Sequence, residues 1–310
     1  MSRAVVFAYH NVGYRCLSVL IAGGVDIALV VTHEDDPNEN VWFGNVASLA
    51  REHGIPVVTP DDPNTDAFVA QLAALKPDLI FSFYYRKMLS PALLELAPMG
   101  AFNMHGSMLP KYRGRVPVNW AIIRGETESG ATLHEMLAKP DAGRIVDQMS
   151  VPILPNDTAR EVFEKVTVAA ELVLHRSLPA LKQGTADLKP QNLAEGSYFS
   201  GRKAEDGRIN WQQSAQALHN LVRAVSEPYP GAFADISGHR LIIWRSIVRT
   251  ETHLAAGHLH AIDGRIFASM ADGSCLELLR AEVDGQVLTA TSFVTIFGDT
   301  ACALPLLEAN

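Results

Sequence analysis

Three polar residues near the middle of the chain have the chemical types that acyl transfer to an amine requires: Asn103, His105 and Asp141. Asn103 and His105 stand two positions apart at the end of an apolar stretch typical of a strand, so their side chains share one face. An amide NH2 stabilises a tetrahedral oxyanion, and an imidazole takes a proton from an attacking nitrogen. A carboxylate folded back beside the imidazole would raise the pKa of that histidine and fix its tautomer. The spacing alone is also compatible with a structural pair, in which Asn103 is a hydrogen-bonded amide and His105 a surface histidine.

The motifs of several common enzyme classes are missing from the sequence. The loop after the first apolar run reads HNVGYRC, without the G-x-G-x-x-G of dinucleotide sites, and no P-loop, H-E-x-x-H or G-x-S-x-G occurs. The three cysteines, Cys16, Cys275 and Cys302, lie far apart with no C-x-x-C pair. We therefore expect neither a disulfide scaffold nor a zinc finger.

Composition indicates a globular protein with a sizeable core. The chain has 310 residues, a formal charge of −8 and 48% hydrophobic residues, which excludes an intrinsically disordered protein. No apolar run approaches the roughly 18 residues of a membrane-spanning helix, and Tyr9 and His10 interrupt the first apolar run too early for a signal peptide. We expect a cytoplasmic protein, and the acidic balance weakens the case for broad nucleic-acid binding.

The first half of the sequence alternates short apolar runs with helical patterns. This alternation predicts an α/β fold with a Rossmann-like, doubly wound parallel sheet, whose sites lie at the carboxyl ends of the strands. The strands are predicted at residues 4–9, 27–32, 56–58, 79–83, 100–104, 131–136 and 145–151. The helices are predicted over residues 14–22, 46–53, 66–75 and 158–181.

The remainder of the chain has a different pattern. Polar, glycine-containing sequence at 189–206 is interpreted as a linker between a catalytic domain at 1–188 and a β-rich domain at 207–305. After the linker, one helix at 214–225 precedes short alternating stretches separated by Gly or Asp turns. We therefore predict a small, mostly antiparallel β domain, either a sandwich or a barrel.

Around the three polar residues the sequence resembles the 10-formyltetrahydrofolate-dependent formyltransferases. That family's pattern is Asn-x-His, Ser-Leu-Leu-Pro, Arg-Gly, Pro, Thr-Gly and a distant Asp-x-Gly. The chain supplies, in order, Asn103, His105, Ser107-Met108-Leu109-Pro110, Arg113-Gly114, Pro117, Ser129-Gly130 and Asp141-x-Gly143. The two departures, Met108 and Ser129, are conservative and do not touch the reacting groups. The resemblance extends to the C-terminal β domain, for which it implies an OB-like barrel.

The resemblance implies a role for each matching residue. Asn103 would stabilise the oxyanion, His105 would be the acid/base group, and Asp141 would raise the pKa of His105. Formyl-folate would be the co-substrate, and no metal is implied. The residues implied to contact folate are Lys87, Met88, Leu89, Arg115, Leu137, Ala138, Lys139 and Pro140. Without the resemblance, Lys87 and Arg115 would be interpreted as solvated surface cations.

Charge separates the branches of the family by acceptor. From Glu205 to Asn310 there are seven Arg, no Lys and twelve Asp or Glu, a net charge of −5. The stretch between His33 and Arg51 is acidic and has no Lys or Arg, whereas in tRNA-directed enzymes the corresponding region resembles a basic insertion. Binding to tRNA needs cations that neutralise phosphates, so both features disfavour a tRNA partner.

Local sequence favours an amino-sugar acceptor. The stretches FAYH, FSFYYR and RAVSEPYPGAF resemble the branch that formylates UDP-4-amino-4-deoxy-L-arabinose, a reaction of lipid A modification and polymyxin resistance. In many bacteria that domain is fused to a dehydrogenase; we expect this chain to transfer formyl only, with another polypeptide supplying the preceding oxidation. The alternatives are a dTDP-linked amino sugar, methionyl-tRNA, or a silent folate- or nucleotide-binding protein. Glycinamide ribonucleotide formyltransferases are much shorter and lack the second domain, so the length of the chain disfavours that acceptor.

Overall fold

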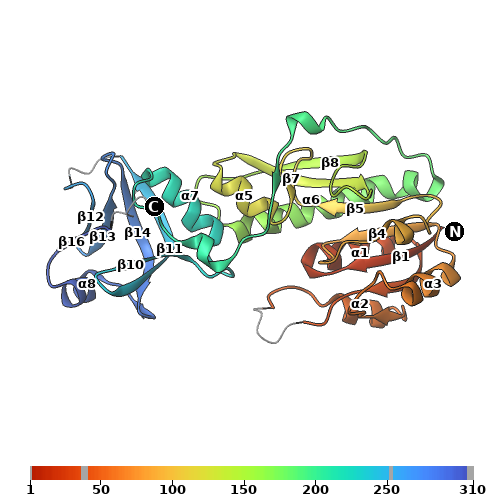
Figure 1. Cartoon of the computed structure of the whole chain (residues 1–310), viewed down its shortest axis with the longest axis horizontal. Helices are drawn as coiled ribbons and strands as arrows, with labels where there is room; N and C mark the ends of the chain where they lie inside the picture. The colour runs from red at the N-terminus through yellow and green to blue at the C-terminus, as the bar shows by residue number, and fades with distance from the viewer. Residues whose placement is uncertain (1, 36–40, 251–253, 306–310) are drawn as a thin grey trace. The chain divides into compact units, whose positions relative to one another are not determined.

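The structure is a computed structural model that describes residues 2–35, 41–250 and 254–305. Residues 36–40 of the acidic loop and part of the C-terminal stretch used in the charge count lie outside the described residues. The chain divides into two compact units (Figure 1). Unit 1 comprises residues up to Pro117, then Glu128–Pro152 and Phe163–Ser200. Unit 2 comprises Val118–Thr127, Ile153–Val162 and the chain from Gly201 onward.

Unit 1 is built on a seven-stranded sheet with the order β3-β2-β1-β4-β5-β7-β8. Its strands are β1 (Arg3–Ala8), β2 (Asp26–Val31), β3 (Val57–Val58), β4 (Leu79–Phe83), β5 (Ala101–His105), β7 (Glu128–Glu135) and β8 (Ile145–Pro152). The first five strands in this order run parallel, which confirms the predicted α/β fold. The last two strands instead pair antiparallel, because the 136–144 turn between them is too short for a crossover helix.

Helices cover both faces of this sheet. They are α1 (His10–Ala22), α2 (Val46–Glu52), α3 (Asp66–Leu75), α4 (Pro91–Leu94) and α6 (Ala159–Gln183). Val5 and Phe7 of β1 pack in one core cluster with Leu72 of α3 and Leu93 of α4. On the opposite face, Gly13 of α1 packs against Ala8 of the same strand. The alternation of side chains along β1 therefore supports a helical layer on each face.

Predicted and observed helices differ mainly at their ends. The third helix has the predicted bounds, with the Thr65 side chain accepting a hydrogen bond from the N–H of Phe68. The first helix begins at His10, four residues before the predicted start, because only Tyr9 separates it from β1. The last begins at Ala159, where Thr158 and Glu161 bond reciprocally as a capping box.

Unit 2 contains an antiparallel sheet with the order β10-β11-β14-β13-β12-β16, with β15 paired to β14. Its strands are β10 (Ala232–Ile236), β11 (His239–Arg249), β12 (His258–Ile262), β13 (Arg265–Ser269), β14 (Cys275–Val283), β15 (Gln286–Val287) and β16 (Ala301–Ala303). The predicted mostly β domain is confirmed. Among the described strands β10 and β16 do not pair, so the sheet is a half-barrel, which is consistent with the predicted OB-like barrel domain.

Unit 2 contains α7 (Ala215–Val225), α8 (Ala290–Phe297), most of α5 (Pro117–Ile123) and the first turn of α6. Leu218, Val222 and Val225 lie on one face of α7 at helical spacing and are buried. That face packs on β11 and β14. The side chain of Ser214 caps α7 by accepting from the N–H of Ala217, as its position before the apolar pattern suggests.

The region interpreted as a linker has structure of its own. It contains the 3-10 turns η1 (Leu193–Glu195) and η2 (Ala204–Gly207) and the short strand β9 (Tyr198–Phe199). The last of these pairs in parallel with β6 (Arg113–Gly114), so residues up to Ser200 are part of unit 1. The domain limits at 188/189 and 206/207 stay a prediction. Within the described ranges, no helix is both long and apolar enough to cross a membrane.

Candidate active site

The predicted catalytic pair lies at the carboxyl end of β5. This strand runs between β4 and β7, and its Met104 is buried on the face opposite Asn103 and His105. The side chain of His105 is buried, whereas Asn103 is partly exposed. Asp141, from the turn between β7 and β8, brings its Oδ1 to 3.6 Å from Nδ1 of His105. The structure therefore gathers all three residues proposed for catalysis.

The hydrogen bonds of His105 define its tautomer. Its Nε2 lies 2.8 Å from the backbone carbonyl oxygen of Tyr112. A carbonyl oxygen only accepts, so Nε2 carries the hydrogen in the neutral ring and Nδ1 carries the lone pair. The 3.6 Å between Nδ1 and Asp141 exceeds hydrogen-bonding distance. The basic nitrogen of His105 is therefore Nδ1, and it has capacity left for a proton.

Burial lowers the pKa of His105 below its ordinary value. Asp141 and the carbonyl of Tyr112 act in the opposite direction but do not overcome it. The influence of Asp141 on the pKa of His105 thus has the predicted sign, and burial of the ring, which the sequence did not reveal, outweighs it. His105 is a neutral base at neutral pH, and the adjacent carboxylate stabilises the imidazolium that forms when this base takes a proton.

Asp141 is held as a carboxylate. Burial of the carboxyl opposes its ionisation, but the neighbouring His105 and the Gly114 N–H lower the pKa of Asp141 well below its usual range. The Gly114 N–H donates to Oδ2 of Asp141 at 2.8 Å. The fixed negative charge lies beside both histidine rings, since His134 Nε2 is 3.6 Å from Oδ1 of Asp141.

The turn that carries Asp141 is fixed by two features. A Cβ on Gly143 would lie 1.9 Å from the carbonyl oxygen of Glu135, so only glycine fits there. The side-chain NH2 of Gln191 donates to the carbonyls of Asp141 at 3.1 Å and Gly143 at 2.6 Å. Sequence reasoning missed Gln191 because it lies in the region interpreted as a linker, about fifty positions from the turn it holds.

Sequence reasoning also missed His134. This residue lies on β7 directly opposite Asn103 in the β5–β7 register, and it is buried. Its Nε2 is 3.1 Å from the side-chain nitrogen of Asn103. The strand itself was predicted, but its pairing partner and register were not, and only these place His134 at the site.

The loop between β5 and β6 is held by neighbouring strands. Thr132 Oγ1 donates to the carbonyl of Ser107 at 2.6 Å, and the NH2 of Gln148 donates to the carbonyl of Leu109 at 2.8 Å. Ser107 Oγ donates to the carbonyl of Lys111 at 2.7 Å, across the base of the loop. The Ser-Met-Leu-Pro part of the motif is therefore structural: it shapes the loop that presents the Tyr112 carbonyl to His105.

The residues implied to bind folate lie on two segments. On the first, Lys87 donates through Nζ to the carbonyls of Pro60 and Asp61, and the Met88 side chain is 59% exposed. Leu89 is buried in the core cluster shared with β1, α3 and α4. A contact between Leu89 and a ligand would therefore involve its backbone rather than its side chain.

The second segment adjoins the catalytic turn. Leu137, Ala138 and Lys139 are exposed, and Pro140 is partly exposed. This segment leads from the end of β7, which carries His134, directly to Asp141. Arg115 follows β6; its side chain is exposed and its backbone N–H donates to the carbonyl of Phe199. No described contact joins the two segments, so their shared role stays a prediction.

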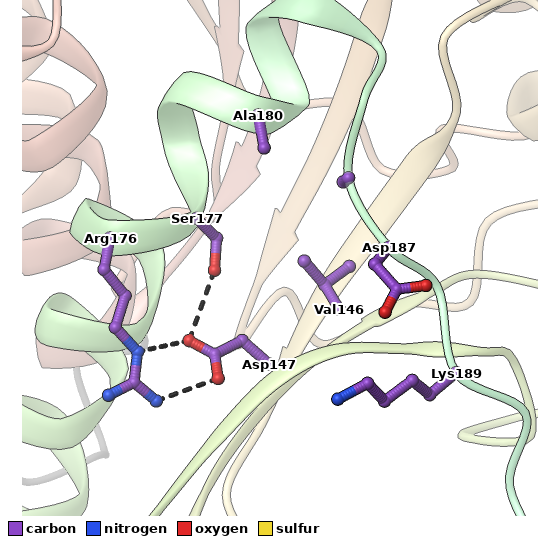
Figure 2. A pocket seen from close by; sticks show the side chains of 8 residues that line it. Val146, Asp147, Arg176, Ser177, Ala180, Asp187 and Lys189 are labelled. Carbon is purple, nitrogen blue, oxygen red and sulfur yellow. Dashed lines mark hydrogen bonds and ion pairs between the residues drawn. The ribbon is translucent and has the colours of Figure 1, made fainter.

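A separate depression on unit 1 has a cavity volume of about 160 Å³ and lies between β8, α6 and the 186–189 stretch. Figure 2 shows that Asp147 and Arg176 form an ion pair at its edge. None of the residues predicted for catalysis or folate binding lines it. Within the described parts of the chain, no three His, Cys, Asp or Glu side chains gather in an arrangement that would hold a metal ion.

Comparison with known families identifies the chain. A family model described as formyl transferase matches residues 10–178, more than half of the sequence. The chain belongs to the formyl transferase family. A second model, described as the formyl transferase C-terminal domain, matches residues 202–298. The predicted family and enzyme class are thereby confirmed, and both units of this formyl transferase have counterparts in the family.

Solved structures share the fold of this formyl transferase. An N-formyltransferase from Helicobacter canadensis, in complex with folinic acid and dTDP-3-aminofucose, is 23% identical with a TM-score of 0.73, over 93% of this chain and 100% of that one. A sugar N-formyltransferase from a Shewanella species is 20% identical (TM-score 0.63; 82% and 99% covered). HypX from Aquifex aeolicus, in complex with tetrahydrofolic acid, is 19% identical (TM-score 0.63) over 94% of this chain and 46% of HypX.

Proposed function

We propose that this formyl transferase moves the formyl group of 10-formyltetrahydrofolate to the amine of a nucleotide-linked amino sugar. The observation that carries the proposal is the group of Asn103, His105 and Asp141 at one strand end, with His105 neutral and its Nδ1 open. An open base, an amide donor and a fixed carboxylate are the groups that formyl transfer to an amine uses.

The reaction follows from this arrangement. The acceptor amine attacks the formyl carbon, and the NH2 of Asn103 donates to the oxygen that becomes negative. His105 Nδ1 takes the proton that the attacking nitrogen loses, and Asp141 stabilises the resulting imidazolium. The bond between the formyl carbon and N10 of the folate then breaks, and the proton passes to N10. The products are a formamide and tetrahydrofolate, with no oxidation or reduction.

Exposed apolar side chains on the two segments implied to bind folate fit such a co-substrate. Met88 and Leu137 are large apolar side chains left in solvent, 59% and 46% exposed. An aromatic pteridine would cover such surface at a favourable free energy of about 25 cal/mol per Å². Folinic acid and tetrahydrofolic acid, the ligands of the two solved relatives above, belong to this class of molecule.

The amino-sugar acceptor is supported by charge and by the relatives. The chain carries a formal charge of −8, which disfavours a polyanionic tRNA. Two of the similar structures are sugar N-formyltransferases or hold an amino-sugar nucleotide. Among sugars we propose UDP-4-amino-4-deoxy-L-arabinose, because of the FAYH, FSFYYR and RAVSEPYPGAF stretches, and hence a role in lipid A modification and polymyxin resistance.

A dTDP-linked amino sugar is the second candidate. It is favoured by the dTDP-3-aminofucose in the Helicobacter canadensis structure. The proposed cytoplasmic location follows from the folate and nucleotide-sugar substrates, which are small soluble molecules.

One competition experiment tests the proposal. The enzyme receives 10-formyltetrahydrofolate with UDP-4-amino-4-deoxy-L-arabinose, dTDP-3-aminofucose and methionyl-tRNA together, and mass spectrometry identifies the formylated product. Formylated UDP-aminoarabinose is the expected result. Formylated dTDP-aminofucose supports the second candidate, and formylated methionyl-tRNA overturns the sugar proposal. Binding of the folate without any formylated product indicates a silent binder.

A further inference from the structure

His134 is a buried histidine that touches two of the three proposed catalytic groups. It lies opposite Asn103 across the β5–β7 pair, with 2% of its surface exposed. Its Nε2 is 3.1 Å from the side-chain nitrogen of Asn103 and 3.6 Å from Oδ1 of Asp141. The proposed mechanism assigns no proton transfer or substrate contact to His134, so any effect of this residue on formyl transfer acts through Asn103 and Asp141.

The tautomer of His134 follows from its other nitrogen. Nδ1 lies 2.9 Å from the backbone carbonyl oxygen of Glu135, which only accepts, so Nδ1 carries a hydrogen. In the neutral ring Nε2 then has the lone pair and is an acceptor. The group of Asn103 that faces it must be a donor, which assigns this end of the amide as NH2 rather than C=O.

We propose that His134 is a positioning residue that holds the Asn103 amide with its NH2 directed into the site. The proposal rests on the proposed function of formyl transfer. An NH2 group has two hydrogens: His134 accepts one, and the other is available for the formyl oxygen as negative charge develops on it. A flipped amide would direct its carbonyl oxygen at the His134 lone pair and at the developing oxyanion, and both contacts would be repulsive.

Substitutions at position 134 should differ in effect according to whether the new side chain can accept a hydrogen bond from Asn103. Gln at position 134 places an acceptor oxygen near the position of Nε2, whereas Met fills a similar volume without an accepting nitrogen or oxygen of comparable strength. Loss of one oxyanion-type donor costs about 10²- to 10³-fold in kcat. His134→Met removes only the hydrogen bond that orients this donor, so we expect kcat to fall about tenfold to 10²-fold.

The test measures formyl transfer by four variants in the full chain. They are His134→Gln, His134→Met, Asn103→Ala and the double variant Asn103→Ala/His134→Met. We expect His134→Gln to keep kcat within about threefold of the parent, and KM for the folate to stay within threefold in all four. The double variant should be no slower than Asn103→Ala alone, because a positioning residue has no effect once its target is removed.

A matched control separates positioning from folding. His260→Met changes another buried histidine, on β12 of unit 2, and should leave kcat unchanged. Multiplicative losses in the double variant, or equal losses in His134→Gln and His134→Met with both variants folded by circular dichroism, overturn the proposal. If His134→Met does not fold, the double variant Asn103→Ala/His134→Gln is compared with Asn103→Ala alone. A lower kcat in the double variant overturns the proposal. A parent enzyme that formylates none of the three acceptors refutes the proposed function instead.

Discussion

Two buried histidines, one in each unit, share a pKa lowered by burial but differ in how many of their ring nitrogens are hydrogen-bonded. Burial lowers the pKa of both His105 and His219. In unit 2, His219 uses both nitrogens: Nδ1 is 3.0 Å from Oγ of Ser246 and Nε2 is 3.0 Å from the carbonyl of Pro155. In unit 1, His105 uses only Nε2. A buried ring with both nitrogens bonded contributes to structure, whereas one with a nitrogen left over is available for chemistry.

The comparison extends to the charged neighbours. Arg223 of α7 is buried and donates to Oδ1 of Asn220 at 2.9 Å and to the carbonyl of Asp157 at 3.2 Å. These hydrogen bonds tie α7 to the stretch around Asp157. Asp141 and His105, in contrast, stay 3.6 Å apart. At this distance neither group satisfies the other by a hydrogen bond, so Nδ1 of His105 keeps its lone pair for a proton.

The largest expected effect separates the two histidines directly. His105→Ala removes the open base and should lower kcat by about 10²- to 10⁴-fold, with substrate binding retained. His219→Gln, the matched change in unit 2, should leave kcat within threefold and lower the melting temperature. Steady-state kinetics and thermal melts of both variants provide the measurement. A kcat of His105→Ala within tenfold of the parent would show that His105 is not the catalytic base and does not differ from His219 in this respect.

Asp141→Asn should have the next largest effect. The amide keeps the size of the carboxylate but withdraws the charge that stabilises the imidazolium of His105, and we expect a loss of about 10²-fold in kcat. The loss should appear in kcat far more than in KM for the folate, since Asp141 acts on the proton transfer. A change confined to KM would place Asp141 in substrate binding.

Acid should affect activity and stability through the same rings. The folded-state pKa of His105 and of His219 is lowered, so unfolded chains bind protons below about pH 6.5 while the folded rings stay neutral. Stability is therefore complete above about pH 6.5 and falls as pH decreases. Melting temperatures between pH 8 and 5 should show this fall, and it should be smaller in His219→Gln. The acid limb of kcat/KM should lie below pH 6.5, and a limb above pH 7 would contradict the lowered pKa of His105.

Gln191→Leu should have the smallest effect of these changes. It removes two hydrogen bonds from the turn that carries Asp141 and leaves two carbonyls without their donor, a cost of about 1–3 kcal/mol each where water cannot replace it. We expect kcat to fall about tenfold, because a carboxylate displaced by an ångström loses much of its effect. Gln212→Leu in unit 2 is the control. Equal kcat values for the two variants would show that the turn needs no support from Gln191.

Sequence reasoning found the residues of the site whose spacing follows from one strand or one motif. Asn103 and His105 were recoverable because a strand has a period of two, and Asp141 because of the Asp-x-Gly pattern in its family context. His134 and Gln191 were not, because strand register and long-range loop contacts leave no periodic signal. The net lowering of the pKa of His105 could not be predicted from the sequence either, because burial of the ring depends on the whole fold.

The fold was predictable where local patterns decide it. The alternation of apolar runs and helical patterns predicted the five parallel strands of unit 1, and the helix at 66–75 was predicted with its observed bounds. The antiparallel pairing of β7 and β8 and the open edge between β10 and β16 depend on which strand meets which. Two-residue strands such as β6 and β9 carry too few residues for any pattern.

The pairing of those two short strands has a consequence for protein engineering. Ser197 Oγ accepts from the N–H of Tyr112, and the carbonyl of that same residue sets the tautomer of His105. Ser197 thus holds Tyr112, whose carbonyl oxygen orients the ring of His105, although the two residues lie far apart in the sequence. A chimaera that exchanges C-terminal domains should therefore join its parents after Ser200. A junction at 188 would combine His105 from one parent with Ser197, which supports it through Tyr112, from the other parent.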